Sequence, residues 1–350
     1  MAKTKNGLSY SDEREATPQP QTYRKPGCLR RGCGCAFGLL LLPFLLLGGF
    51  LFWNTHRPQP GTRDKEIFPG IKYTREVSKD SPKQVIHIIT IPLNSPDISF
   101  LVTPPDDKKA ERPLKARTTS QFLKEFKVQI AMNGDNYYPF EESTFMHYQP
   151  SLKDLTDPGK LPEKLWSSYP QPGDPVETEG FSASRGVTYC DSEEKRSSFP
   201  TLYLSQDNKV SFHKPIGKVY NAISGSLMIL DRGKHLEPDE KKVVYTERHP
   251  RTAIGIDRDG KWLILLVADG RQPNYSEGMT LMELSDALER HGAWSAMMLD
   301  GGGSTTLAIE DKSGSVSMLN SPIEKRIPGR ERPVANHIGV FVKSANPVAP

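Results

Sequence analysis

Cysteine is scarce and unevenly placed in this 350-residue chain. Cys28, Cys33 and Cys35 crowd into one short segment, and Cys190 stands alone in the rest of the sequence. A lone cysteine excludes a disulfide within that larger part. The C-x4-C-x-C cluster has no fourth ligand nearby, which is poor spacing for zinc. We expect unmodified thiols there, with acylation as the sharper alternative.

Most of the chain also lacks a net charge. Residues 1–35 hold seven of the 46 basic residues and three of the 42 acidic ones, so the remaining 315 residues hold 39 of each. The overall charge of +4 therefore belongs to the N-terminal tail. A protein that binds nucleic acid through its body would need a basic surface. We therefore expect no nucleic-acid partner.

Long apolar runs are absent except for one, at residues 36–53. Its 18 residues carry no charge and are near the lower limit for crossing a bilayer. Arg24, Lys25, Arg30 and Arg31 precede it, which favours a cytoplasmic N-terminus. We expect a cytoplasmic tail at 1–35, a single-pass anchor at 36–53 and an extracytoplasmic body. A cleaved signal peptide is the alternative, but the preceding 35 residues are long for one.

Helical periodicity is rare in the body, whereas short β-branched runs are common. We expect a helix after Thr118 and another between Thr280 and Gly292, each beginning with a capping residue. The expected strands include 85–91, 98–103, 128–132, 201–205, 210–214, 252–256, 262–268, 295–299 and 305–309. The fold class is α+β, with mixed, mostly antiparallel sheets and few helices.

The spacing of these segments also predicts how they connect. The strands 85–91 and 98–103 are expected to pair, and Asp-Gly and Gln-Asp-Asn-Lys turns predict two later hairpins. Residues 54–83 are rich in proline and charge and predict a linker or stalk. Residues 139–180 form a long irregular excursion. One domain should therefore span 84–343, followed by a tail at 344–350.

The familiar motifs of catalysis are missing: the sequence has no H-E-x-x-H, G-x-S-x-G or C-x-x-C. Instead, three polar clusters each follow a predicted strand. They are Asn133-Gly134-Asp135, Asp269-Gly270-Arg271 and Asp300-Gly301-Gly302-Gly303-Ser304. Loops that leave strand ends can converge on one point, so we expect a shared mouth.

The three consecutive glycines are the sharpest local feature. Such a run has a large entropic cost, which is tolerated where φ is positive or a ligand lies close. Exposed amides there can form an anion-binding nest, with Ser304 as an extra donor. A tight connection in which Asp300 accepts bonds from the loop amides explains the run equally well. Arg251, which begins an apolar strand, can bind a phosphate or carboxylate in bidentate fashion. His337 is expected to be solvated or satisfied in the core.

Six segments together resemble the phosphodiester glycosidase family in order and spacing. They are NGDNYY (133–138), ISG (223–225), RTAIGI (251–256), DGR (269–271), LDGGGSTTL (299–307) and RPVANHIGV (332–340). The resemblance covers about residues 85–343. The family commonly has a second glycine where this chain has Asp135, which adds a carboxylate near the mouth.

The resemblance implies hydrolysis of a sugar-1-phosphodiester at its glycosidic bond. Asp269 and Asp300 would be the catalytic carboxylates. The substrate would be bound by residues from all six segments: Asn133, Gly134, Asp135, Ser224, Gly225, Arg251, Arg271, Gly301, Gly302, Gly303, Ser304 and Asn336. No cofactor is required by the sequence, although a divalent cation at Asp135 stays open. The alternatives are a glycan-binding module without catalysis and a scaffold for exopolysaccharide export.

Overall fold

The computed structural model describes residues 41–50, 52, 53, 56–138, 170–212, 214–237 and 243–343. The chain forms two compact units, residues 1–51 and 52–350, and residues 41–50 of the first are helical. No described helix combines the length with the apolar composition that a membrane span requires. Several predicted features lie partly or wholly outside the described residues: the tail 1–35, the anchor 36–53, the excursion 139–180, and the tail 344–350.

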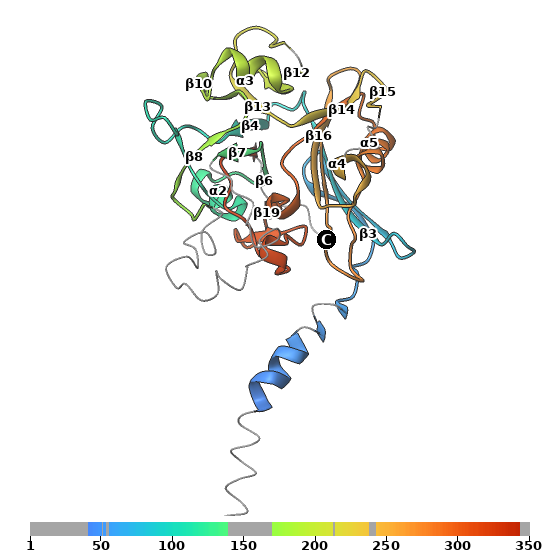
Figure 1. Ribbon diagram of the computed structural model, residues 1–350. Helices are drawn as coiled ribbons and strands as arrows, with labels where there is room; N and C mark the ends of the chain where they lie inside the picture. Colours follow the sequence, from blue (N-terminus) through green and yellow to red (C-terminus); the bar gives the residue numbers. More distant parts are fainter. Residues whose placement is uncertain are drawn as a thin grey trace, which may run out of the picture. The chain divides into compact units, whose positions relative to one another are not determined.

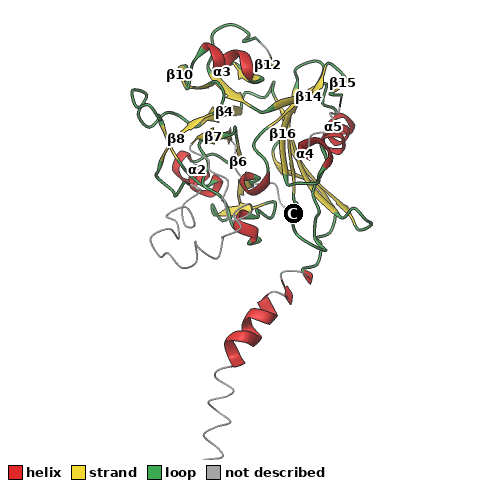
Figure 2. Cartoon of the chain, in the orientation of Figure 1, coloured by secondary structure: helices red, strands yellow, loops and turns green. Residues whose placement is uncertain are grey.

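The second unit is built mainly of strands, with few and short helices (Figure 2). Every pair of named strands runs antiparallel, and the described residues hold a single parallel bridge, between Ile323 and Arg330. The predicted α+β class with mostly antiparallel sheets is therefore confirmed for this unit.

The largest sheet has eight strands in the order β1-β2-β3-β17-β16-β18-β14-β15. Its strands are β1 (Arg63–Phe68), β2 (Ile71–Ser78), β3 (Gln84–Pro92), β14 (Leu227–Asp231), β15 (Lys234–His235), β16 (Arg251–Ile256), β17 (Trp262–Ala268) and β18 (Ser295–Met298). Ile89 and Ile91 of β3 enter the main core, whereas Ile86 and Ile88 enter the cluster that includes helix α5. Burial on both faces explains why β3 is apolar without alternation.

Three smaller sheets complete the fold (Figure 1). The first contains β9 (Ser182–Ser184), β10 (Val187–Tyr189), β11 (Thr201–Leu204), β12 (Val210–Phe212) and β13 (Asn221–Ser224). The second contains β4 (Ile98–Val102), β6 (Ile130–Asn133), β19 (Leu307–Glu310), β20 (Val316–Met318) and β21 (His337–Val342). The third contains β5 (Leu114–Lys115), β7 (Tyr137–Tyr138) and β8 (Pro175–Thr178). The main core joins side chains from the eight-stranded sheet to both five-stranded sheets.

Both predicted helices are present: α2 (Thr119–Phe126) after Thr118 and α5 (Leu281–Arg290) after Thr280. The second unit also contains the short helices α3 (Glu193–Ser198) and α4 (Val243–Thr246) and the 3-10 turns η3 (Gly302–Ser304) and η4 (Glu324–Arg326). Thr118 and Thr280 each form a capping box, which satisfies amides that the first helical turn leaves without partners. The two predicted hairpins, β11–β12 and β16–β17, are also confirmed.

Two connections differ from the prediction. The strands near 85–91 and 98–103 do not pair: β3 lies between β2 and β17, and β4 pairs with β21 in another sheet. The short loop between β3 and β4 favoured a hairpin. However, β3 is long and apolar, and it is covered along its length by β2 on one side and β17 on the other. The expected linker at 54–83 contains β1 and β2, so the ordered domain starts well before residue 84. The charged residues of β1 are tolerated because it is an edge strand.

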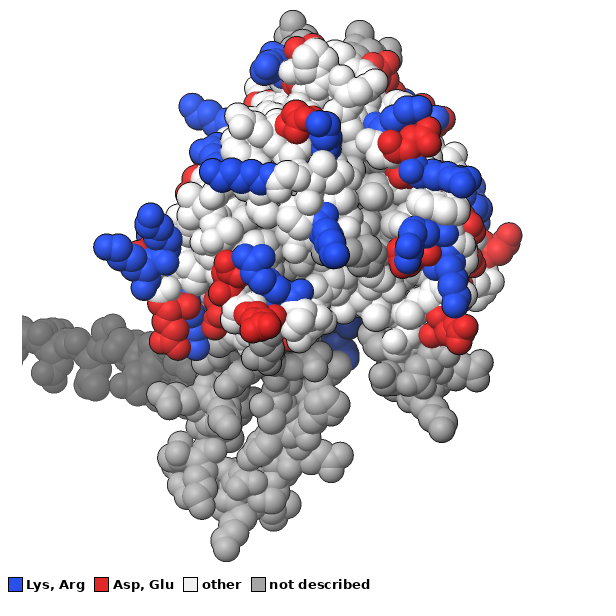
Figure 3. Space-filling model, turned by 90° about the horizontal axis from the view of Figure 1, so that it is seen from above, with Lys and Arg blue, Asp and Glu red and all other residues white. Residues whose placement is uncertain are grey.

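Charges of both signs are interspersed on the surface seen in Figure 3, without a large patch of one sign. Charged side chains of the domain also pair with their neighbours, for example Lys261 with Asp259 and Lys209 with Asp207. This pattern agrees with the balanced charge of the body. That face offers no basic surface of the kind that a phosphate backbone requires.

His337 lies in the core, where it stacks on Phe122 with ring centroids 4.7 Å apart. Burial, together with the charge of Arg117, lowers the pKa of His337 to about 3. The unfolded chain accepts the proton near pH 6.5, whereas the folded chain resists it until about pH 3. Protonation therefore favours unfolding, and stability should fall as the pH drops from about 6.5 toward 3.

His337→Phe should remove this part of the acid sensitivity, because phenylalanine keeps the ring and does not titrate. Relative to the variant, the unmodified protein should lose about 1.4 kcal/mol of unfolding free energy per pH unit within that window. Urea unfolding of both proteins at pH 7, 5 and 4 measures the difference. A difference that does not change with pH would contradict the assignment.

Candidate active site

The glycine-rich segment begins where β18 ends and is fixed there through its backbone. The amide of Asp300 donates to the carbonyl of Gly134 at 2.9 Å, and the Asn133 side-chain amide donates to the carbonyl of Asp300 at 2.7 Å. Asn133 also accepts bonds from the Thr252 hydroxyl and the Thr306 amide, each at 3.0 Å. Asn133 is fully buried and ties three segments together at the site.

Asp300 is half-buried as a residue, and the surroundings of its carboxyl change the proton affinity of that group. Burial raises the pKa of Asp300 to about 6, and the charge of Glu179 acts in the same direction. The Arg332 guanidinium, the Ser304 hydroxyl and the Gly301 amide oppose this rise by favouring the carboxylate. A carboxyl with this pKa changes its protonation state close to neutral pH.

The glycines allow two arginines to approach the loop. Gly302 has φ of +60°, and a Cβ atom there would lie 3.1 Å from the Arg271 guanidinium. At Gly303 a Cβ atom would lie 2.4 Å from Arg332 Nη2, closer than a real side chain permits. The positive φ predicted for the glycine run is therefore present at Gly302, and the space beside Gly302 and Gly303 is taken by arginine side chains.

The amides of the loop are largely used within the chain. The Gly302 amide donates to the carbonyl of Pro250 at 2.9 Å, and the Ser304 amide donates to that of Gly301 at 3.2 Å. The Gly301 amide interacts with the Asp300 carboxylate. This arrangement matches the tight connection weighed against the anion-binding nest. Of the two cations beside the loop, Arg271 is exposed, whereas Arg332 is buried and paired with a carboxylate.

Arg332 is the charged neighbour of the loop that sequence reasoning did not single out. Its guanidinium is 7% exposed, donates to Glu324 at 2.6 Å and contacts the Ser304 hydroxyl at 3.4 Å. Tyr137, also buried, interacts with Ser304 and donates to the carbonyl of Pro333 at 3.2 Å. Arg332 and Tyr137 both fall inside family-like segments, and that position was the signal that could have identified them.

Two further carboxyls lie within electrostatic reach of Asp300. Asp135 is fully buried; its Oδ2 accepts from the Gly180 amide at 2.8 Å, and its Oδ1 has no hydrogen-bond partner. Burial raises the pKa of Asp135 to about 7, and the charges of Glu179 and Asp300 add to this. Glu179 is partly exposed; its carboxylate accepts from the Asn136 side chain at 2.9 Å and from the Tyr138 hydroxyl at 2.8 Å. Glu179 lies at the end of the predicted excursion, where no strand or motif marked it.

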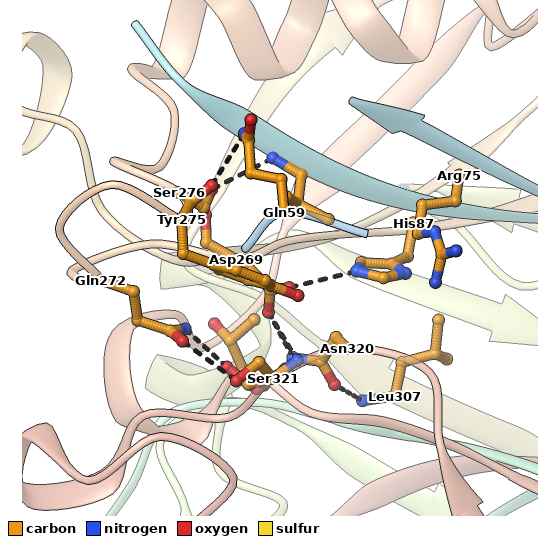
Figure 4. Close-up of polar contacts among 12 residues, drawn as sticks. Gln59, Arg75, His87, Asp269, Gln272, Tyr275, Ser276, Leu307, Asn320 and Ser321 are labelled. Carbon is orange, nitrogen blue, oxygen red and sulfur yellow. Dashed lines mark hydrogen bonds and ion pairs between the residues drawn. The ribbon is translucent and has the colours of Figure 1, made fainter. Parts of the chain in front are cut away.

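Asp269, predicted to be the catalytic partner of Asp300, lies in a different environment (Figure 4). Its carboxylate is 1% exposed and faces His87 at 3.2 Å. The other carboxylate oxygen accepts from the Asn320 side chain at 3.1 Å and from the Ser321 amide at 2.8 Å. Both oxygens therefore have partners inside the protein. This environment fits a structural carboxylate, and the catalytic role expected of Asp269 stays a prediction.

Most other predicted site residues are buried near the glycine loop and form contacts within the protein. Asn336 is buried and accepts from the Asp135 amide at 2.8 Å, and Gly134 donates to the Asn336 carbonyl. Ser224 is buried and donates to the carbonyl of Phe181, and Gly225 packs against the backbone of Met298. None of these contacts places the side chain outward toward a substrate.

Arg251 was expected to meet a phosphate but points into the protein. It is 3% exposed, and its guanidinium donates to the carbonyls of Met279 at 2.9 Å and Glu247 at 3.0 Å. Burial and the nearby charge of Arg271 lower the pKa of Arg251 to about 10. Arg271, in contrast, is exposed and covers Gly302. Arg271 and Arg332 are thus the guanidinium groups nearest to the loop.

The described part of the chain holds no group of three or more histidine, cysteine, aspartate or glutamate side chains arranged to bind a metal ion. Asp135, considered as an ion ligand, has the Gly180 amide as its nearest polar contact.

Comparisons with known proteins bear on the fold and on the family of the chain. Among solved structures, the chain resembles the catalytic domain of zebrafish N-acetylglucosamine-1-phosphodiester α-N-acetylglucosaminidase, which is auto-inhibited by its pro-peptide. The identity is 18% and the TM-score 0.52, over 81% of this chain and 88% of that one. A hypothetical protein from Synechocystis matches at 16% identity with a TM-score of 0.47, over 81% of this chain and 64% of that one. Likeness at these identities establishes the fold alone.

Sequence comparison gives the family itself. An 80-residue segment is 35% identical to the uncharacterised prophage-derived protein YomE of Bacillus subtilis, which is 23% of this chain and 12% of that protein. The match thus spans only a small part of that relative. The sequence model of the phosphodiester glycosidase family matches residues 126–341, more than half of the chain. The resemblance seen in the six segments is confirmed, and the chain belongs to the phosphodiester glycosidase family.

Proposed function

We propose that this domain hydrolyses the glycosidic bond of sugar-1-phosphodiesters, with Asp300 as its acid–base group. The setting of Asp300 carries the proposal. Asp300 follows the end of β18 and is half-buried as a residue, burial raises the pKa of its carboxyl to about 6, and the cationic Arg332 lies beside it. A general base works best when its pKa is near the working pH. Membership of a glycosidase family supplies the reaction class.

In this proposal, Asp300 takes a proton from the water that attacks the anomeric carbon. The bond between that carbon and the phosphate oxygen breaks, and its electron pair leaves with the phosphate. The products are the free sugar and a phosphomonoester. Phosphate is a good leaving group, so the negative charge that develops on it needs stabilisation more than protonation. Arg332 and Arg271 supply that stabilisation beside the loop.

The second carboxylate of the site is Glu179 in this proposal, in place of Asp269. Glycosidases use a pair of carboxyls on either side of the bond that is cleaved. Glu179 is partly exposed and acts electrostatically on both Asp300 and Asp135. Asp135 is fully buried and feels the charges of both, so we assign it an electrostatic role rather than contact with substrate.

Hydrolysis and its pH dependence test the function together. The protein should release free sugar from a synthetic sugar-1-phosphodiester, with kcat/KM falling about tenfold per pH unit below about pH 6 because the base must be ionised. A coupled assay for free sugar between pH 4.5 and 8 measures this. Binding of the diester without release of sugar would instead indicate the non-catalytic glycan-binding module.

The location of the domain is also part of the proposal. The apolar run 36–53 follows a basic segment and is proposed to hold the protein in a membrane with residues 1–35 in the cytoplasm. The glycosidase domain would then act outside the cytoplasm, on carbohydrate of the cell envelope.

A further inference from the structure

The segment that follows the apolar run is attached to the body from Arg57 onward. The Arg57 guanidinium donates to Gln272 at 2.6 Å and to the Ser321 hydroxyl at 2.9 Å. It also lies over the ring of Tyr275, 3.8 Å from the centroid. Two hydrogen bonds and a cation–π contact from one side chain make a specific docking point.

The next residues continue this attachment without a break. Gln59 donates to the carbonyls of Ser78 at 2.8 Å and Tyr275 at 2.9 Å. Arg75 donates to the carbonyl of Gly61 at 2.8 Å, and β1 begins at Arg63. Gln59 and Tyr275 lie together in Figure 4, on the network that holds Asp269. From Arg57 onward, therefore, the chain is part of the folded domain and not a free stalk.

The docking point belongs to the same network that supports the glycine loop. The Ser321 amide and the Asn320 side chain both donate to Asp269, and Asn320 also donates to the carbonyl of Thr305 at 3.1 Å. Thr305 directly follows Ser304. The entry of the chain and the candidate active site are thus joined by a few consecutive hydrogen bonds.

This attachment changes how far the domain can be from a membrane. A linker over residues 54–83 would reach about 100 Å when extended, whereas the path from Trp53 to Arg57 reaches only about 14 Å. Phe52 and Trp53 are largely exposed, at 65% and 64%. Exposed aromatic residues at the end of an apolar run are typical of the membrane–water interface.

We infer that the domain is held at the bilayer surface and that its substrate is a sugar-1-phosphodiester whose phosphate carries a membrane-embedded lipid. The inference rests on the proposed function and on the anchor at 36–53. A domain this close to the bilayer has a high effective concentration toward lipid-linked molecules in the same membrane. It has little reach toward glycans that lie far from that membrane.

Full-length protein in phospholipid vesicles provides the test, with two substrates compared. One is a sugar-1-phosphate diester of a long-chain alcohol embedded in the same vesicles, and the other is its water-soluble methyl diester. A 24-residue Gly/Ser segment inserted between Thr55 and His56 lengthens the tether but preserves the Arg57 contacts. The matched control carries the same segment between Gly7 and Leu8, before the apolar run.

The tether insertion should lower the rate on the embedded diester by roughly tenfold or more, because effective concentration falls with about the 3/2 power of tether length. The rate on the methyl diester should not change, and the control insertion should alter neither rate. Equal rates on the embedded diester with and without the tether insertion would overturn the inference. Proteolytic cleavage between the apolar run and Arg57, which would free the domain from the membrane, would overturn it as well. If the unmodified protein hydrolyses neither diester, the proposed function itself fails.

Discussion

Asp300→Asn should lower kcat by about 10²-fold or more, the scale of losing an acid–base group. The asparagine keeps the shape of the side chain and can still accept from the Ser304 hydroxyl and the Gly301 amide. Arg332 retains its ion pair with Glu324 at 2.6 Å. The variant should therefore fold normally, and the loss should lie in turnover. Steady-state kinetics with a soluble diester, together with thermal unfolding, measure the two effects separately.

The loss should also follow the protonation of Asp300. The residual activity of Asp300→Asn should no longer fall below about pH 6, because the group whose ionisation limits the rate has been removed. Asp259→Asn is the matched control, since Asp259 is exposed on the β16–β17 turn and its pair with Lys261 is a surface contact. Turnover of Asp300→Asn near that of the control would reject Asp300 as the acid–base group.

The features that sequence predicted correctly are local ones. The N-cap at Thr118, the capping box at Thr280, the Asp-Gly hairpin and the positive φ of Gly302 each depend on a few adjacent residues. Such features follow from propensities and turn geometry that nearby residues determine. The same reasoning placed Asp300 at a strand end, where the structure has it.

The features that sequence missed depend on distant partners. The strand β3 pairs with β17, about 180 residues away, and β4 pairs with β21, more than 200 residues away. The segment with β1 and β2 resembled a linker because strands at the edge of a sheet tolerate charged residues. These residues form strands because they pair, through β2, with the apolar strand β3. Glu179 gave no local signal because its importance comes from its electrostatic proximity to Asp300.

The three strand-end clusters illustrate both outcomes. Each was expected to contribute to one mouth, and two of them do meet: Asn133 donates to the Asp300 carbonyl. The third cluster contributes Arg271 to the loop but turns the carboxylate of Asp269 into the protein. An Asp-Gly-Arg sequence cannot indicate which of its side chains points inward, because the left-handed φ of Arg271 reorients the chain there.

Asp269→Ala should be strongly destabilising, by about 3 kcal/mol or more, because it leaves the partners of a buried charge without their acceptor. The groups affected are His87, the Asn320 side chain and the Ser321 amide. Asn320 also bonds the carbonyl of Thr305 and the amide of Leu307, so the damage would reach the strand that leaves the glycine loop. Urea unfolding at neutral pH measures the loss.

Asp269→Asn separates a structural role from a catalytic one. The side-chain oxygen of the asparagine can still accept from the Ser321 amide, whereas its NH2 group cannot accept. Because one acceptor is kept, the free energy of unfolding should fall by less than in the alanine variant. If Asp269 is structural, the folded Asn variant keeps turnover within a few-fold at temperatures well below its unfolding transition. If Asp269 were one of the catalytic carboxylates, turnover would drop about 10²-fold even where the protein is fully folded. Asp259→Ala, which removes an exposed carboxylate, should change stability by less than about 0.5 kcal/mol. A full loss of turnover without loss of stability in Asp269→Asn would restore the pairing of Asp269 with Asp300 and remove Glu179 from the mechanism.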